Sequence, residues 1–106
     1  MKTFSERAYE LLKKVPRGRV TTYKELAHAL NTKAYRAIGQ AMRNNPYAPK
    51  VPCHKVVASD GSIGGFSGKK SGKAIQEKIE MLKKEGIVFE KNKIKNFEKK
   101  IVRFTL

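Results

Sequence analysis

The segment 22–46 constrains the fold most, because its sequence predicts two short helices joined by a tight turn. A Thr-x-x-Glu capping box that starts at Thr22 predicts a helix over about residues 23–30. The polar pair at 31–32 then interrupts the apolar pattern and can cap a second helix over about residues 33–44. Two short helices joined in this way form a helix-turn-helix.

The second of these predicted helices has an apolar stripe and a basic face. The stripe has helical spacing and is expected to pack on the core; its members are Ala34, Ala37, Ile38, Ala41 and Met42. The other face carries Lys33, Arg36, Gln40 and Arg43. On an isolated surface helix such side chains would only be solvated. In the second helix of a helix-turn-helix they are expected to contact DNA.

The rest of the chain predicts a small mixed fold around this motif. Thr3 and Glu6 have capping-box spacing, and the apolar positions after them predict a helix to about Lys14. A further helix is expected over Ala74 to Glu85. Short strands or turns are expected over 19–22, 55–58 and 87–89, a Gly-rich loop over 59–68, and a covering hairpin or helix within 87–106. We therefore expect one domain over residues 1–106, mainly helical in the α+β class and winged-helix-like.

The chain is strongly basic, with 24 Lys and Arg against 9 Asp and Glu and a formal charge of +15. The basic residues are interleaved with core-forming residues, which favours a nucleic-acid partner over an anionic membrane surface. No stretch approaches the roughly 20 apolar residues of a membrane span, and no apolar signal region begins the chain. We therefore expect no membrane association and a cytosolic location, or a nuclear one in a eukaryotic host.

Cys53 is the single cysteine of the chain, so an internal disulfide is excluded. With two histidines in the whole sequence, a four-ligand zinc site is not expected. A lone cysteine is most often a small buried hydrophobe. Here it lies between Pro52 and the pair His54-Lys55, a rigid and cationic setting that favours the reactive thiolate. Because adjacent side chains often point apart, these residues alone give only a hint of nucleophilic catalysis.

Several motifs together resemble one family. They are Val20–Ala27, Ala34–Pro46, Pro52–Val57, Gly64–Gly68 and Leu82–Gly86. In this order they resemble the O6-alkylguanine-DNA alkyltransferases, also called methylated-DNA-protein-cysteine methyltransferases, over roughly residues 4–89. Many members carry an N-terminal domain with metal ligands before this region. The resemblance therefore implies the catalytic and DNA-binding domain alone, with no metal and no cofactor.

The resemblance implies a role for each catalytic residue. Cys53 would accept the alkyl group from O6 of guanine and be consumed. His54 would act as its general base through a bridging water, and Glu85 would orient and stabilise the imidazole. Asn45 would brace the turn that carries the cysteine.

The resemblance also implies how double-stranded DNA containing O6-alkylguanine would be bound by a monomer. Arg36 would enter the duplex in place of the flipped guanine, and Tyr23 would crowd the phosphate of that nucleotide. The small residues Ala34, Ala37 and Ala41 would let this helix enter the narrow minor groove.

The base pocket is where the sequence departs from the family pattern. Base-contacting or supporting positions correspond to Met42, Val56, Phe66, Ser67 and Lys78. Phe66 stands where many members have a Tyr whose hydroxyl helps protonate the departing guanine. Lys55 stands where Arg is usual. Lysine keeps the positive charge but lacks the planar guanidinium group that can form two parallel hydrogen bonds.

Three other functions would each account for some of these features. Short relatives called alkyltransferase-like proteins bind the lesion without repairing it, but they replace the cysteine that this chain keeps as Cys53. A helix-turn-helix regulator would explain residues 21–45 and the charge, yet gives no reason for the Pro-Cys-His segment. A cysteine hydrolase would not need a DNA-binding helix.

Overall fold

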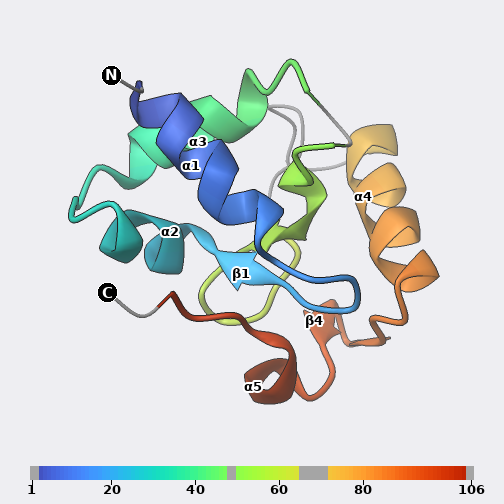
Figure 1. The fold of residues 1–106 in the computed structure, drawn as a ribbon. Helices are drawn as coiled ribbons and strands as arrows, with labels where there is room; N and C mark the ends of the chain where they lie inside the picture. Colours follow the sequence, from blue (N-terminus) through green and yellow to red (C-terminus); the bar gives the residue numbers. More distant parts are fainter. Residues whose placement is uncertain (1–2, 48–49, 65–71, 105–106) are drawn as a thin grey trace.

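The computed structural model describes residues 3–47, 50–64 and 72–104 (Figure 1). The α-helices are α1 (Phe4–Lys13), α2 (Tyr23–Ala29), α3 (Tyr35–Arg43), α4 (Lys73–Lys84) and α5 (Phe97–Lys100). A 3-10 helix, η1 (Cys53–Lys55), lies between α3 and α4 in the chain. The expected mainly helical α+β architecture with a helix-turn-helix is confirmed, with α2 and α3 as the paired helices.

The first two helices begin where the capping boxes predicted. The Thr3 hydroxyl accepts a hydrogen bond from the Glu6 backbone N–H at 3.1 Å, and the Glu6 carboxylate accepts one from the Thr3 N–H at 3.3 Å. The Thr22 hydroxyl accepts the Glu25 N–H at 3.0 Å and caps α2. Local side-chain chemistry therefore sets both helix starts.

The predicted start of α3, the second helix of the helix-turn-helix, was wrong by two residues. Its N-cap is Ala34, which makes no side-chain capping bond, and the helix begins at Tyr35 rather than Lys33. Thr32 instead accepts the backbone N–H of Ala34 at 3.0 Å, and Asn31 has a left-handed φ of 55°. These two residues therefore shape the turn rather than cap the helix.

The strands are short and join distant parts of the chain. β1 (Thr21–Thr22) pairs in parallel with β2 (Val56–Val57), and β3 (Phe89–Glu90) pairs antiparallel with β4 (Lys93–Ile94). The β1–β2 register sets Thr21 against Val56. Since β1 leads directly into α2 and β2 directly follows η1, this pairing holds the helix-turn-helix beside the cysteine segment.

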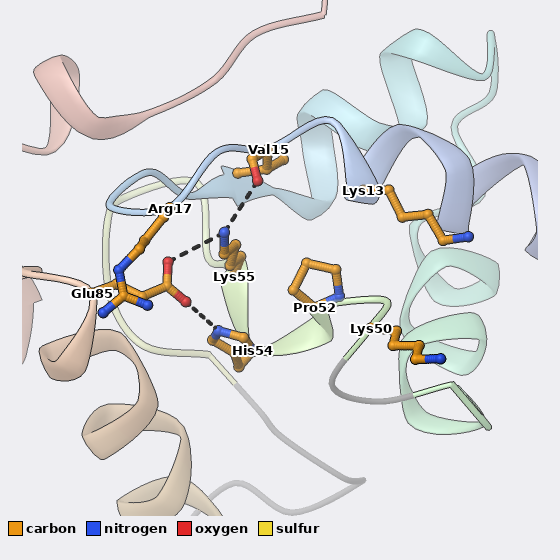
Figure 2. A pocket seen from close by; sticks show the side chains of 8 residues that line it. All are labelled: Lys13, Val15, Arg17, Lys50, Pro52, His54, Lys55 and Glu85. Carbon is orange, nitrogen blue, oxygen red and sulfur yellow. Dashed lines mark hydrogen bonds and ion pairs between the residues drawn. The ribbon is translucent and has the colours of Figure 1, made fainter.

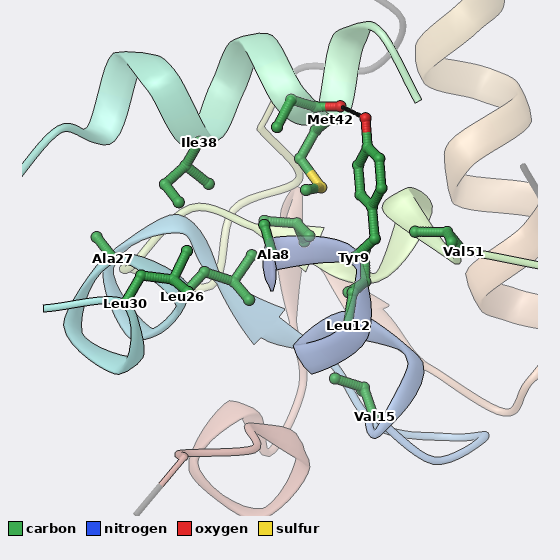
Figure 3. Packing of buried hydrophobic residues seen from close by; sticks show 12 residues of the cluster. Ala8, Tyr9, Leu12, Val15, Leu26, Ala27, Leu30, Ile38, Met42 and Val51 are labelled. Atoms are coloured by element: carbon green, nitrogen blue, oxygen red, sulfur yellow. Dashed lines mark hydrogen bonds between the residues drawn. The ribbon is translucent and has the colours of Figure 1, made fainter. Parts of the chain in front are cut away.

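The main core lies between α1, α2 and α3 (Figure 3). Its buried members include Ala8, Leu12, Leu26, Leu30, Ile38 and Met42. The Tyr9 hydroxyl donates to the Ala41 carbonyl at 2.8 Å, which satisfies the polar end of a buried aromatic ring. A second apolar cluster is formed by Val20, Val57, Leu82, Ile87 and Ile94. These clusters fix α3 and α4 on either side of the cysteine segment.

The expected hairpin or helix at the end of the chain is present as both elements. β3 and β4 form the hairpin and α5 follows it. Beyond α5 the chain runs beside β1, where Val20 N–H donates to Lys100 O at 2.9 Å and Val102 N–H donates to Val20 O at 2.7 Å. None of the helices in the described residues has the length and apolar character needed to cross a bilayer.

Candidate functional site

Cys53 is the first residue of η1 and is half-buried. Its backbone N–H donates to Val51 O at 2.9 Å, and the N–H of Lys55 donates to Pro52 O at the same distance. These bonds close two consecutive tight turns around the thiol. The cysteine is therefore held on a short segment closed by hydrogen bonds, and β2 begins three residues later at Val56.

His54 is paired with a carboxylate from the far end of α4. Its Nε2 lies 2.8 Å from Glu85 Oε2, and both side chains are largely buried. An ionised carboxylate at this position requires the imidazole to carry a proton on Nε2, which leaves the lone pair of the neutral ring on Nδ1. The arrangement provides a base with a fixed orientation next to the thiol residue in the chain.

The second oxygen of Glu85 is also occupied (Figure 2). The Gly18 backbone N–H donates to Oε1 at 3.0 Å, and Lys55 Nζ lies 3.2 Å from the same oxygen. Burial acts to raise the pKa of Glu85, but the bonds from His54, Gly18 and Lys55 outweigh it and the pKa lies below its usual value. Glu85 is therefore held as an anion, and each of its two oxygens faces a hydrogen-bond donor or a cation.

Lys78 supports the other side of the cysteine segment. Its side chain is 0% exposed, and Nζ donates to Val56 O at 2.7 Å and to Ile63 O at 2.5 Å. Burial lowers the pKa of Lys78 to about 7, although the nearby Cys53 acts in the opposite direction. The buried Lys78 amine thus joins α4 to β2 and to the segment that follows it.

Asn45 links the end of α3 to the residues before the cysteine. Its side-chain amide donates to Val51 O at 2.7 Å, and its carbonyl oxygen accepts the Tyr47 N–H at 2.9 Å. Asn45 therefore makes contacts of the kind expected of a brace for this turn.

The outward face of α3 and the turn before it carry exposed basic and polar side chains. Lys33, Arg36, Gln40 and Arg43 are exposed, as is Ala34, which was wrongly predicted to face the core. Ala37 is half-buried. Ala41 is 4% exposed because the helical repeat turns it toward Tyr9, so its side chain does not reach the outward face.

Tyr23, the first residue of α2, lies near the cysteine segment. The ring is half-buried and close to Gly64, where an added Cβ would lie 3.5 Å from it. Burial, and then the nearby Cys53, raises the pKa of the Tyr23 phenol. The start of α2, which is the first helix of the helix-turn-helix, thus borders the site.

The expected base-pocket residues are not all exposed to a ligand. Met42 is 7% exposed and Val56 is 0% exposed, and both pack in the main core. Phe66 and Ser67 lie outside the described residues, so the structure does not place them. Lys78 contacts the residues after Cys53 through the backbone carbonyls of Val56 and Ile63.

A shallow pocket of about 380 Å³ opens on the side of the His54–Glu85 pair (Figure 2). It is lined by Lys13, Val15, Arg17, Lys50, Pro52, His54, Lys55 and Glu85. In the described part of the chain, no group of three or more His, Cys, Asp or Glu side chains is placed to hold a metal ion. The lining of this pocket supplies an imidazole, a carboxylate and four cationic side chains.

Sequence reasoning missed two partners of Glu85. The sequence indicated the charge of Lys55 but no contact for it. The second partner is Gly18. Gly18 has a left-handed φ of 82°, which turns its N–H toward the carboxylate. No local pattern links residues 18, 55 and 85, so the sequence carried no signal for this contact.

Comparison with known families gives a match over most of the chain. Residues 3–87 match the family described as 6-O-methylguanine DNA methyltransferase, DNA binding domain. A methylated-DNA–protein-cysteine methyltransferase from Thermococcus kodakarensis is 51% identical over 85 residues, which are 79% of this chain and 45% of that protein. The chain thus spans less than half the length of that relative.

Solved structures give the same result for the fold. An O6-methylguanine-DNA methyltransferase from Pyrococcus kodakaraensis KOD1 superposes with a TM-score of 0.69 at 51% identity, over 82% of this chain and 48% of that one. S. pombe Atl1, in complex with damaged DNA containing O6-carboxymethylguanine, has a TM-score of 0.79 at 26% identity. That comparison covers 97% of this chain and 99% of Atl1.

Proposed function

The chain belongs to the 6-O-methylguanine DNA methyltransferase family, and on that premise we propose that it transfers an alkyl group from O6 of guanine in duplex DNA to Cys53. The observation that carries the proposal is the 2.8 Å contact of Glu85 with His54, the residue that follows Cys53 in η1. This arrangement supplies a base of fixed orientation next to the only thiol. We expect the protein to act as a monomer, with one molecule consumed for each lesion.

The proposed reaction exchanges one bond for another. His54 takes the thiol proton through a water, and Glu85 stabilises the imidazolium that forms. The thiolate then attacks the alkyl carbon, so that an S–C bond forms while the C–O6 bond breaks. The bond pair leaves with O6, and the departing guanine takes up a proton. Because the resulting thioether does not hydrolyse readily, each protein molecule reacts once.

The proposed DNA contacts follow from the outward face of α3. Its exposed side chains include Arg36 near the N-terminal end and Arg43 near the C-terminal end. A base stacked in a duplex cannot bring O6 to a half-buried thiol, so the nucleotide must be rotated outward. We propose that Arg36 fills the space that the guanine leaves, and that Tyr23, which borders the site, assists the rotation.

The test is the intact mass of the protein after incubation with a duplex that contains one O6-methylguanine. The expected result is a gain of one methyl group, in a total amount equal to the protein, on the wild type and not on Cys53→Ala. The variant should still bind the lesion duplex in preference to an undamaged one. A mass gain on both proteins, or repeated turnover without a mass gain, would overturn transfer to Cys53.

A second candidate function is a lesion sensor that binds alkylated guanine without transfer. It is favoured by one observation, the nearly complete mutual coverage with Atl1 in complex with damaged DNA. Tight and lesion-selective binding by the wild type, with no change in mass, would support this function. The retained Cys53 and its neighbouring imidazole favour transfer.

A further inference from the structure

Tyr35, the first residue of α3, is a large aromatic residue that the fold leaves 45% exposed. The other tyrosines have contacts within the fold, since Tyr9 and Tyr47 pack edge to face at 6.0 Å and Tyr23 is half-buried. In the described part of the chain, Tyr35 forms no aromatic pair and no hydrogen bond through its hydroxyl. Single exposed apolar side chains are common on protein surfaces, so exposure alone does not assign Tyr35 a role.

Gly39 lies one helical turn after Tyr35 on the same flank of α3. Residues four apart along an α-helix are neighbours on its surface. A Cβ placed on Gly39 would meet no atom within 4 Å, so no neighbouring part of the described fold requires a glycine there. Glycine inside a helix is unfavourable, because it loses more conformational freedom on folding than any other residue. Gly39 therefore keeps the surface of α3 open beside Tyr35 without a benefit to the fold.

Arg43 continues the same line one turn further on, and its side chain is exposed. The eight residues from Tyr35 to Arg43 span about 12 Å along the helix axis. An aromatic ring, an open backbone surface and a guanidinium thus follow one another on this flank. This order suits a nucleic-acid strand, because a ring packs on a nucleotide and a guanidinium binds a phosphate.

The charges around Tyr35 also favour DNA over a protein partner. Lys33 and Arg36 are exposed close to it in the sequence, and α3 contains no acidic residue. Protein–protein interfaces are depleted of charged residues at their centres, whereas surfaces that bind nucleic acid are basic.

We infer that Tyr35 is a DNA-contacting residue, whose ring packs against the nucleotide next to the flipped guanine while the strand passes over Gly39 toward Arg43. The inference rests on the proposed function, in which Arg36 fills the space left by that guanine. Tyr35 directly precedes Arg36, and successive Cα atoms lie about 3.8 Å apart. Successive nucleotides of a strand lie about 3.4 Å apart along the duplex axis, so a ring beside Arg36 reaches the neighbouring nucleotide.

The first experiment measures binding to a duplex with or without one O6-methylguanine, in the Cys53→Ala protein so that no transfer occurs. Adding Tyr35→Ala should weaken binding to the lesion duplex by about tenfold, as expected for the loss of one aromatic contact with a nucleotide. Binding to the undamaged duplex should weaken less. Tyr35→Phe keeps the ring and should preserve the affinity. Val88→Ala shortens another exposed apolar side chain, outside the helix-turn-helix, and should have no effect.

The salt dependence of binding separates a ring contact from a charge contact. Arg43→Gln should reduce the slope of log affinity against log salt concentration by about one, because one phosphate contact is lost. Tyr35→Ala should leave this slope unchanged and lower the affinity at every salt concentration. An unchanged affinity in Tyr35→Ala, or an equal loss on lesion and undamaged duplexes, would overturn the inference.

Gly39→Leu tests the open flank independently of Tyr35. Its Cβ meets no atom of the described fold and leucine favours helix, so the variant should unfold at the same urea concentration or a higher one. Its affinity for the lesion duplex should nevertheless fall, because the added side chain occupies the path of the strand. Undiminished binding by Gly39→Leu would also refute the inference. A wild type that shows no methyl transfer refutes the proposed function, while the binding comparisons still decide the role of Tyr35.

Discussion

His54 Nε2 lies 2.8 Å from Glu85 Oε2, although 31 residues separate them in the sequence. The contact joins η1 to the C-terminal end of α4. Through Gly18 and Lys55, the same carboxylate also reaches the loop after α1. A single buried anion therefore connects three segments around the thiol, and its removal is expected to affect both chemistry and stability.

Glu85→Gln should remove part of the acid sensitivity of the fold. The ordinary pKa of the Glu85 carboxyl is 4.5, and folding lowers it. Its contribution to the free energy of unfolding is therefore present above pH 4.5 and is lost as the pH falls through the lower pKa of the folded state. Urea unfolding at pH 6 and at pH 3 should show a wild-type advantage over Glu85→Gln that shrinks on acidification. Glu80→Gln, an exposed carboxylate on α4, is the control and should show no such change. A constant wild-type advantage would contradict the prediction.

Lys78→Met should remove a rise of stability at alkaline pH. Burial lowers the pKa of Lys78 from 10.5 to about 7, so between these values the unfolded chain holds a proton that the folded chain has released. The wild-type free energy of unfolding should therefore gain roughly 2–4 kcal/mol between pH 7 and 10 relative to Lys78→Met. Lys84→Met, at an exposed position on the same helix, should keep the wild-type slope. Parallel slopes in wild type and Lys78→Met would show that the buried amine stays charged.

Asn45→Ala should loosen the turn before the cysteine. The change removes the bond to Val51 O and the acceptor for the Tyr47 N–H, and each such loss costs about 1 kcal/mol. We expect a decrease of about 1–2 kcal/mol in the free energy of unfolding and a slower transfer reaction. The exposed neighbour Asn44→Ala is the matched control. If both variants lose the same stability, the side-chain bonds of Asn45 have no special role.

Arg36→Ala should separate base flipping from chemistry. Arg36 is exposed on α3 and is not bonded to the catalytic residues, so its loss should slow transfer from duplex DNA by about tenfold or more. Transfer from free O6-methylguanine base should change little. Arg7→Ala, an exposed arginine on α1, should change neither rate. Equal losses with both substrates would exclude the proposed role of Arg36 in filling the duplex.

Local signals in the sequence predict most of the secondary structure near the N-terminus. Capping hydroxyls at Thr3 and Thr22 and apolar spacing predicted the first helices, because such signals act between residues within one or two turns. The adjacency of Cys53 and His54 marked the site, and the order of the motifs indicated the family and, with it, Glu85. The start of α3 was missed because Thr32 bonds to Ala34 within the turn instead of capping the helix.

The contacts between side chains from distant segments depend on the packing of the whole fold. The burial of Ala41, the approach of Tyr23 to the site, and the contacts of Glu85 with Gly18 and Lys55 all join segments that no sequence pattern connects. These contacts depend on how α1, α4 and the β1–β2 pair pack. A buried carboxylate is stable only when its hydrogen bonds and charge are matched, and the packing of distant segments determines which groups are within reach.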